Sequence, residues 1–379
     1  MRISSLRSFG AGKTCTAMDE PIDRTLFLHL GMSKTATTYL QTEVFPELEG
    51  VNFFDQPRTD RIEGGPFQGL FARAFKRSPA VWTRAGDQLL ADLFDRSEPG
   101  SEATDVLISD QSAGPAMWET GPYAGPNWER ERKDPYFLRA HLEALAEAIA
   151  GWGFDDLRVL LIVRRQDEWI ASKYAQRSDR ILHASQAHFE ERLAYYLDPE
   201  RGYLSDGIVL DYALLRAQLV RAVGTDNVLI LPYELLETDP LSFLKRVVDF
   251  LDSDGDCRRE QLEALVRGEA KNVRSSAEDT WRLRPRTMRD LPLPASLPHR
   301  VSRLVKRSIR ILSRLGRRDR VIRLTPTLRK RVLDRFAASN RRLDRHLPVC
   351  LDRYGYVPQQ RADRPESERF SPEQTDAGA

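Results

Sequence analysis

The segment that most constrains the fold runs from residue 24 to residue 46. A short apolar run, Arg24-Thr-Leu-Phe-Leu-His-Leu30, ends at Gly31, which is typical of a buried strand that enters a turn. The polar loop Gly31–Thr38 follows, and residues Thr38–Phe45 then have helical spacing that stops at Pro46. A strand, a glycine-containing loop and a helix in this order predict one unit of a parallel α/β sheet.

The same alternation continues along the chain. Three more short apolar runs predict buried strands, at Asp105–Ser109, Leu157–Val163 and Asn227–Leu231. Helical patterns separate or follow them, at Tyr136–Ala150, from near Asp167, at Pro240–Leu251 and at about Thr327–His346. This order predicts an α/β fold in which helices cover both faces of a parallel sheet, with ligands bound at the carboxyl ends of the strands.

Composition favours a protein without disulfides, metal-binding cysteines or membrane spans. Three cysteines are isolated in the sequence and odd in number, so neither a disulfide framework nor a zinc site is expected, and a reducing cytoplasm fits best. The sequence contains no run of about 18 apolar residues, so no membrane span is expected. We expect a disordered leader at 1–22, one domain at 23–357 and a disordered polar tail at 358–379. No secretory signal is expected, because no apolar segment follows the positively charged residues at the start of the sequence.

The loop after the first predicted strand is a candidate phosphate site. Backbone N–H groups between a strand and a helix N-terminus attract anions, and Lys34 adds a full positive charge. Thr35, Thr37 and Thr38 supply hydroxyl donors for the phosphate, and Ser33 and Ala36 complete the loop. The alternative is a helix cap with two threonines and an exposed lysine. Gly10–Thr14 is similar to the end of a Walker A motif, but Arg7 stands where that motif needs a glycine, and the segment is assigned to the leader.

Two segments carry a resemblance to a known family. His29-Leu-Gly-Met-Ser-Lys-Thr-Ala-Thr-Thr-Tyr-Leu-Gln41 resembles the 5′-phosphosulfate loop of sulfotransferases that use 3′-phosphoadenosine 5′-phosphosulfate (PAPS), especially bacterial carbohydrate-type members. Their pattern is close to G-x-x-K-T-G-T-T-x-L-Q, and this chain departs from it at Ala36, where glycine is usual. Val163–Tyr174 resembles the 3′-phosphate motif, in which an arginine at a strand end and a serine eight residues later hold that phosphate. Arg164 and Ser172 have this spacing.

Weaker similarities extend the resemblance to residues 24–276 and 327–357. Asn227–Pro240 resembles the late strand with its Y-E-x-L and D-P signature, and Ser339-Asn340-Arg341 is similar to bacterial members. Lys271–Ser276, with Arg274, resembles the segment that covers the 3′ side of the nucleotide. The resemblance implies a P-loop-NTPase-like parallel sheet flanked by helices, PAPS as co-substrate without a metal, and transfer to an alcohol of a carbohydrate or lipid-linked acceptor.

Sulfuryl transfer of this kind needs alignment of the acceptor with the donor, stabilisation of the leaving phosphate and a base for the acceptor hydroxyl. Lys34 and the loop amides meet the second need. Bacterial relatives often have a glutamate at the position of Gln111, and a glutamine cannot act as a base. Asp110 is therefore the first candidate for the base and His29 the second, although a buried strand histidine is the simpler interpretation of His29.

Residues 277–326 form a basic, proline- and arginine-rich insert that carries none of the resemblance. From Arg282 to Arg331 there are 17 Lys or Arg against two acids. Residues 299–316 are predicted to form a basic amphipathic helix. We favour packing of its apolar face on the α/β core, because that face lacks the Trp and Phe of a membrane anchor; peripheral contact with an acidic membrane is the alternative. No nucleic-acid partner is expected.

The sequence therefore predicts a cytoplasmic PAPS-dependent sulfotransferase. Two other functions compete with it. One is a PAPS- or PAP-binding protein that lost its base at Gln111. The other is a P-loop kinase, which is disfavoured because no strand with a magnesium-binding Asp stands out.

Overall fold

The computed structural model describes residues 24–32, 34–48, 50–55, 74, 77–89, 105–110, 135–181, 183–200, 208–251, 279–284 and 320–358. The predicted leader, the tail from 359, and the basic helix at 299–316 lie outside the described residues. No helix of the described part is long and apolar enough to cross a membrane.

The core is a five-stranded sheet in the order β2-β3-β1-β4-β5, and every neighbouring pair is parallel. In that order the strands are Val51–Asp55, Asp105–Asp110, Thr25–Leu30, Asp156–Val163 and Val228–Pro232. The four predicted strands are confirmed as β1, β3, β4 and β5, within one or two residues at their ends. The edge strand β2 was not predicted.

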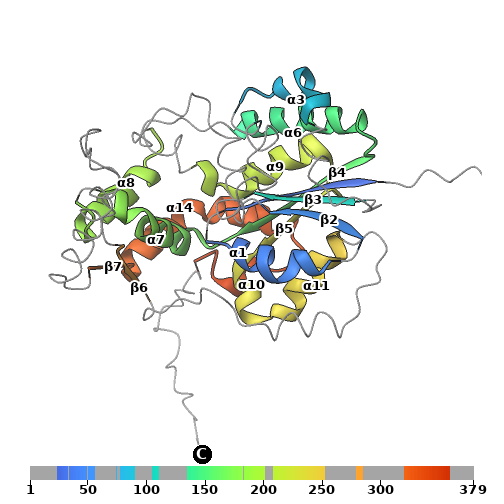
Figure 1. Ribbon diagram of the computed structural model, residues 1–379. Coiled ribbons are helices and arrows are strands. Elements are labelled where there is room, and N and C mark those ends of the chain that lie inside the picture. Colours follow the sequence, from blue (N-terminus) through green and yellow to red (C-terminus); the bar gives the residue numbers. More distant parts are fainter. Residues whose placement is uncertain are drawn as a thin grey trace, which may run out of the picture.

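Side chains of β1 alternate between the two faces of the sheet, as strand geometry requires. Leu26, Leu28 and Leu30 face the cluster that includes α6 (Pro135–Ala150) and α9 (Tyr212–Val223), with α3 (Val81–Arg84) outside α6. Phe27 lies in the opposite cluster, with α11 (Pro240–Leu251). Figure 1 shows α6 and α9 on one side of the sheet and α1, α10 (Tyr233–Thr238) and α11 on the other. The predicted α/β fold, a P-loop-NTPase-like parallel sheet flanked by helices, is confirmed.

The helix after the first loop is not a uniform α-helix. It begins as α1 (Thr37–Tyr39), continues as a π-helical segment at Leu40–Val44 and ends in a 3₁₀ turn at Phe45–Glu47, which contains Pro46. Its apolar side chains pack against Phe27 of β1. The structure thus confirms a helical segment that ends near Pro46. Its π-helical part is wider than a regular α-helix.

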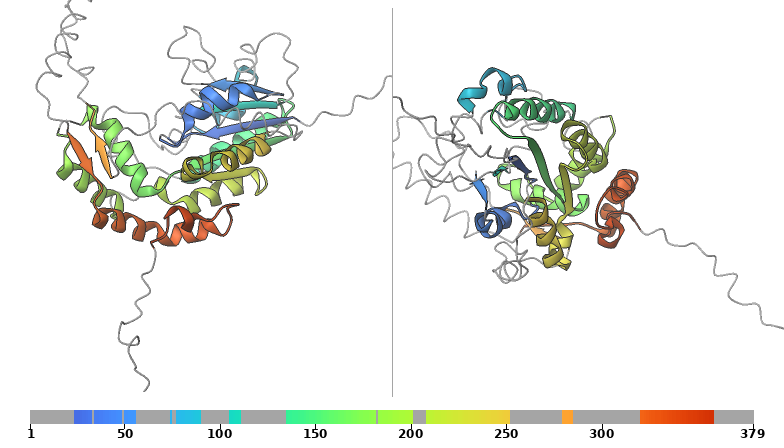
Figure 2. Two further views of the ribbon diagram at one scale, coloured as in Figure 1. Left: turned by 90° about the horizontal axis from the view of Figure 1, so that it is seen from below. Right: turned by 90° about the vertical axis from the view of Figure 1, so that its right-hand side faces the viewer.

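A second group of helices lies beyond the carboxyl end of β4. It comprises α7 (Gln166–Arg177) and α8 (Gln186–Leu197), and α14 (Pro326–Asp344) contacts both of them as well as α9. Figure 2 shows α14 running along this side of the molecule. The small antiparallel sheet of β6 (Thr280–Arg282) and β7 (Val321–Arg323) lies beside α7 and α8. The two ends of the predicted insert are therefore strands paired with each other.

Candidate active site

The candidate site lies where the carboxyl ends of β1 and β4 meet. These strands are neighbours, and the chain leaves β1 toward β2 at one edge of the sheet but leaves β4 toward β5 at the other, so their ends form a topological switch point. The loop 31–36 follows β1, and Arg164 follows β4 directly. Arg164 Nη1 donates to the Lys34 carbonyl oxygen at 3.3 Å. The structure thus joins the two motifs, which are 130 residues apart in sequence.

The backbone of the loop is left-handed at two positions, with φ of 74° at Lys34 and 59° at Ala36. Left-handed φ is costly for residues other than glycine because Cβ approaches the backbone. The glycine that is usual at position 36 therefore has a conformational reason, and Ala36 holds the same conformation with some strain. Alternation of handedness turns successive N–H groups toward one side of a loop, which is the geometry of anion-binding nests.

Replacing Ala36 with glycine is expected to raise the free energy of unfolding by about 1 kcal/mol, because it removes this strain. Chemical denaturation measures the change. The matched control is Ala217→Gly, at an exposed position inside α9, which should lower stability by about 1 kcal/mol. Equal destabilisation by both substitutions would contradict a left-handed Ala36.

The loop threonines separate into two groups. Thr35 and Thr37 are buried, and their hydroxyls both donate to the carbonyl oxygen of Met32, at 2.6 and 3.4 Å. Their side chains close the loop on itself, so any contact they make with an anion would come from backbone N–H groups. Thr38 is exposed, and Ser33 lies outside the described residues.

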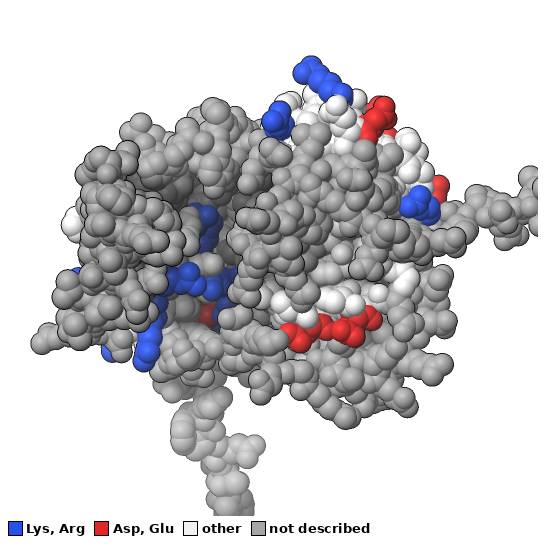
Figure 3. Space-filling model, viewed as in Figure 1, with Lys and Arg blue, Asp and Glu red and all other residues white. Residues whose placement is uncertain are grey.

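Lys34 is half-buried, and its ammonium group has no hydrogen bond or ion pair with any described residue. Burial, followed by the charges of Arg284 and Arg164, lowers the pKa of its ammonium group from the ordinary value. A cation that lies near two further cations without a carboxylate of its own is a site for an anion. Figure 3 shows Lys and Arg side chains gathered in a hollow of the surface between α7 and α1.

Arg164 is held on several sides and still has a free donor. Its Nη2 lies 3.3 Å from Glu168 Oε2, its guanidinium lies 4.8 Å from the ring centroid of Tyr233, and its carbonyl oxygen accepts a 2.6 Å hydrogen bond from the Tyr212 hydroxyl. Its Nε is buried and has no partner among the described residues. The fixed guanidinium can therefore offer at least one further hydrogen bond, as an oxyanion site needs.

Ser172 lies on α7, about 9 Å along the helix from its first residue. Its side chain is half-buried, and its hydroxyl makes no hydrogen bond with a described residue. The structure thus places Arg164 before the helix and Ser172 on it, with no hydrogen bond between them, and each has a donor that bonds no described residue.

Arg284 is a site residue that the sequence analysis missed. It is the second residue after the strand β6. Its backbone N–H donates to Ser178 Oγ at 2.7 Å, and this bond fixes one end of the insert against the end of α7. Its charge is one of those that lower the pKa of Lys34. The basic composition of the insert was the available signal, but it did not indicate which arginine approaches the loop. Arg274, the residue that was predicted from the resemblance, lies outside the described residues.

A network of ion pairs holds the first turn of α7. Asp167 is fully buried and accepts from Arg165 Nε at 2.7 Å and from Arg329 Nε, on α14, at 2.9 Å. Arg329 also pairs with Asp279, just before β6. Since the buried Asp167 has two charged partners, removal of both arginines would leave its charge unpaired, which is strongly destabilising. This network connects the helix that carries Ser172 to α14 and to the insert.

Polar residues of the other segments that resemble the family also have structural partners. Glu234 accepts from the Arg165 N–H at 2.9 Å and from the Tyr356 hydroxyl at 2.8 Å, and burial raises its pKa to about 6. Asn340 forms a reciprocal amide pair with Gln166, at 2.7 and 3.1 Å. Both sets of bonds attach the C-terminal elements to the start of α7, so they position the site without reaching it.

Asp110 lies at the end of β3, in register with Leu30 of β1. Its carbonyl oxygen accepts from the Gly31 N–H at 3.3 Å, and its residue is 1% exposed. It therefore stands beside the start of the phosphate loop. Gln111, the next residue, lies outside the described residues.

His29 is on the opposite face of the sheet from Asp110 and is completely buried. Its Nδ1 lies 2.7 Å from Ser109 Oγ, which also accepts from Gln41 Nε2 at 2.9 Å, and its ring meets Phe45 edge-on. Burial lowers the pKa of His29 to about 3. A neutral histidine in this position supports the packing of the loop helix on β1. Asp110 is equally buried, but it lies on the other face of the sheet, at the strand end beside Gly31.

Folding stability is expected to fall in acid because of His29. In the unfolded chain this histidine binds a proton below about pH 6.5, whereas in the folded chain it does so only near pH 3, so stability rises with pH across this interval by up to about 1.4 kcal/mol per pH unit. The check is urea denaturation at pH 6.5 and 4.5 for the wild type and His29→Asn. The wild type should lose about 2 kcal/mol more than the variant. His141 and Glu234 titrate in both proteins, so an equal loss would mean that His29 ionises freely.

Among the described residues, no group of three or more His, Cys, Asp or Glu could hold a metal ion. That the reaction needs no metal stays a prediction from the resemblance.

No family model matches the chain, and no curated protein has a matching sequence. Solved structures do match. A sulfotransferase from Alicyclobacillus acidocaldarius is 14% identical, with a TM-score of 0.45 over 86% of this chain and 98% of that one. Mouse sulfotransferase SULT7A1 complexed with PAP is 13% identical, with a TM-score of 0.33 over 65% and 64% of the two chains. The sulfotransferase domain of the Synechococcus PCC 7002 olefin synthase is 16% identical, with a TM-score of 0.33 over 77% and 96%. These three solved structures to which the chain is similar are all sulfotransferases, the family that its two motifs resemble.

Proposed function

We propose that this protein is a PAPS-dependent sulfotransferase that transfers a sulfuryl group to a hydroxyl of a carbohydrate or lipid-linked acceptor. The observation that carries the proposal is Lys34, a half-buried cation with no partner among the described residues, beside Arg164 and Arg284 at the carboxyl ends of β1 and β4. The acceptor class and the cytoplasmic location rest on the family resemblance.

The unused donors support a nucleotide with two anionic ends. Lys34 and the amides of the left-handed loop would bind the 5′-phosphosulfate. The free Nε of Arg164 and the free hydroxyl of Ser172 would bind the 3′-phosphate, with a contribution from Arg274. Arg284 adds positive charge near Lys34. Ser33 completes the loop in this proposal.

In the proposed reaction, the acceptor oxygen forms a new bond to sulfur while the bond from sulfur to the bridging oxygen of the 5′-phosphate breaks. Lys34 stabilises the negative charge that gathers on that leaving oxygen, which becomes part of PAP. Asp110 takes the proton of the acceptor hydroxyl. Arg164 and Ser172 hold the nucleotide so that the acceptor, sulfur and leaving oxygen align.

Recognition of the 3′-phosphate is the test that separates a PAPS site from the ATP site of a kinase. Titration calorimetry should give tighter binding of PAPS than of adenosine 5′-phosphosulfate, which lacks the 3′-phosphate. Ser172→Ala should weaken PAPS binding about tenfold, because it removes one hydrogen bond to a charged group, and leave adenosine 5′-phosphosulfate unaffected. The second ligand is thus the internal control for folding of the variant.

Other results would indicate another function. Tighter binding of ATP with magnesium than of PAPS would overturn the proposal in favour of a kinase. Binding of PAPS without transfer to any member of a broad panel of glycans and lipid-linked alcohols would favour the non-catalytic PAPS-binding protein, for which the glutamine at position 111 is the specific observation.

A further inference from the structure

Gln41 is the last residue of the loop motif, and its side chain reaches from the loop helix to the end of β3. Its Nε2 donates to the Ser109 carbonyl oxygen at 3.1 Å and to Ser109 Oγ at 2.9 Å. Both residues are fully buried, and 68 positions separate them in sequence. The side chain thus joins two elements of the candidate site that are distant along the chain.

The partners fix the orientation of this amide. A carbonyl oxygen can only accept a hydrogen bond, so the nitrogen of Gln41, and not its oxygen, must face Ser109. Both N–H groups of the amide are then used. The Ser109 hydroxyl in turn can donate to Nδ1 of the uncharged His29, which lies 2.7 Å from Ser109 Oγ. The three buried side chains therefore form one ordered series of hydrogen bonds between the loop helix, β3 and β1.

This network includes two polar atoms that lower stability. His29 Nε2 and Gln41 Oε1 are buried and have no hydrogen-bond partner. An unpaired buried polar atom costs free energy, and apolar side chains of the same shape would avoid that cost. Packing alone therefore does not explain a glutamine in this position.

The bonds of Gln41 act next to the candidate base. The Ser109 carbonyl belongs to the peptide group that precedes Asp110, and the carbonyl of Asp110 itself accepts from the Gly31 N–H at 3.3 Å. The backbone of Asp110 is thus held on both sides of its Cα by groups of the segment 31–41. The same segment would bind the phosphosulfate in the proposed reaction.

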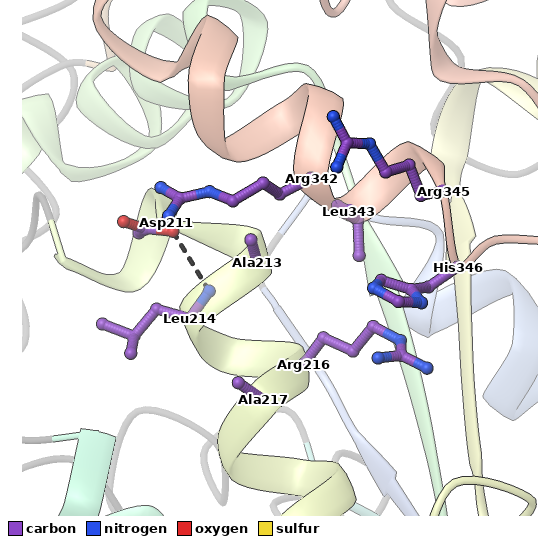
Figure 4. Close-up of a pocket in the computed structure, with 9 residues that line it drawn as sticks. All are labelled: Asp211, Ala213, Leu214, Arg216, Ala217, Arg342, Leu343, Arg345 and His346. Carbon is purple, nitrogen blue, oxygen red and sulfur yellow. Dashed lines mark hydrogen bonds between the residues drawn. The ribbon is translucent and has the colours of Figure 1, made fainter.

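A comparison with Asp211 shows what sets this contact apart. Figure 4 shows the Asp211 carboxylate accepting from the Leu214 N–H, three residues away, which caps the start of α9. That bond shapes a single helix. The bonds of Gln41 cross between two elements, and they begin in the π-helical segment Leu40–Val44, a kind of turn that is frequent at functional sites.

We infer that Gln41 is a positioning residue for sulfuryl transfer, which sets the place of Asp110 relative to the donor loop through the Ser109 carbonyl. The inference rests on the proposed function. Gln41 acts through Ser109 and not by donating to a ligand, because both N–H groups of its amide are used. A misplacement of about 1 Å can lower a rate about 100-fold, so a bond that aligns the base with the donor affects kcat strongly.

Replacing Gln41 with methionine removes both hydrogen bonds and keeps a side chain of similar length. We expect kcat to fall by about 10- to 100-fold, while the Kd of PAPS, measured by calorimetry, changes by less than about twofold. In the Asp110→Asn background the same substitution should not lower kcat further, because the base that Gln41 positions is already absent. The matched control is Ser109→Ala, which removes Oγ but keeps the carbonyl bond, so its kcat should fall by about threefold at most.

Gln41→Glu keeps the shape of the side chain and is the second variant, for the case that circular dichroism shows the methionine variant to be unfolded. A protonated carboxyl group at this position can donate one hydrogen bond to the Ser109 carbonyl, whereas a carboxylate cannot donate and repels it. The kcat of this variant relative to the wild type should therefore fall as pH rises. General loosening of the loop would not produce this pH dependence.

Several results would overturn the inference. A Kd of PAPS that rises as much as kcat falls would mean that Gln41 serves the donor loop alone. Additive losses in the double variant, or full activity of Asp110→Asn, would mean that Gln41 does not act through Asp110. Equal losses in Gln41→Met and Ser109→Ala would assign the effect to packing. Absence of PAPS binding by the wild type would instead refute the proposed function, and this inference with it.

Discussion

Replacing Lys34 with alanine is expected to lower the rate of sulfuryl transfer by about 100- to 1,000-fold, the usual cost of one preorganised group that stabilises a developing charge. The ammonium group has no structural partner among the described residues, so its loss removes no bond on which the fold depends. Single-turnover kinetics with PAPS and a competent acceptor give the rate of the chemical step. The matched control is Lys245→Ala, which removes an exposed lysine from α11 and should leave the rate unchanged.

The pH dependence of the same enzyme provides an independent readout. Lys34 acts as a cation, and burial together with Arg284 and Arg164 lowers its pKa. The protonated form is therefore lost as pH rises through a value below that of an ordinary lysine, and the alkaline limb of the rate profile should begin correspondingly early. A Lys34→Ala variant that retains the rate of the wild type would refute the assignment of Lys34.

Replacing Asp110 with asparagine should lower kcat by about 100- to 10,000-fold, the range for loss of a general base, and leave the affinity for PAPS unchanged. The two side chains have nearly the same shape, so the packing at the end of β3 is retained. The measurement combines steady-state rates with calorimetry of donor binding. Full activity of Asp110→Asn would show that another group takes the proton. His29→Asn, already needed for the acid-stability measurement, should keep most of its activity because that ring is buried on the other face.

Local signals were sufficient for four of the five strands of the main sheet. The strands β1, β3, β4 and β5 are short and mostly apolar, and such runs predict strands that are covered on both faces. The strand β2 lies at the sheet edge and is half-exposed, so its pattern is weaker. The helix α9 has recognisable boundary residues, Asp211 before it and Gly224 after it, and could have been predicted. The three-residue strands β6 and β7 exist through pairing over a distance in sequence that no local pattern encodes.

The residues of the candidate site could be named from the sequence, but the contacts that they make could not. Resemblance to the two family motifs, and not spacing alone, selected Lys34, Arg164 and Ser172. The hydroxyls of Thr35 and Thr37 were expected to face a phosphate, and the structure uses them to bond Met32 instead. That choice depends on the left-handed turns at Lys34 and Ala36, which are a property of the folded loop. The approach of Arg284 depends on the pairing of β6 with β7.

The pairing of these two strands has a consequence for how the chain can vary. The Leu283 N–H donates to the Arg320 carbonyl oxygen at 2.8 Å, so the segment between them leaves and re-enters the fold at the same point. Closing a loop of twice the length costs only about 0.6 kcal/mol more. Insertions and deletions between residues 284 and 320 therefore change the cost of closing this segment only slightly, and the pairing of β6 with β7 can persist through them.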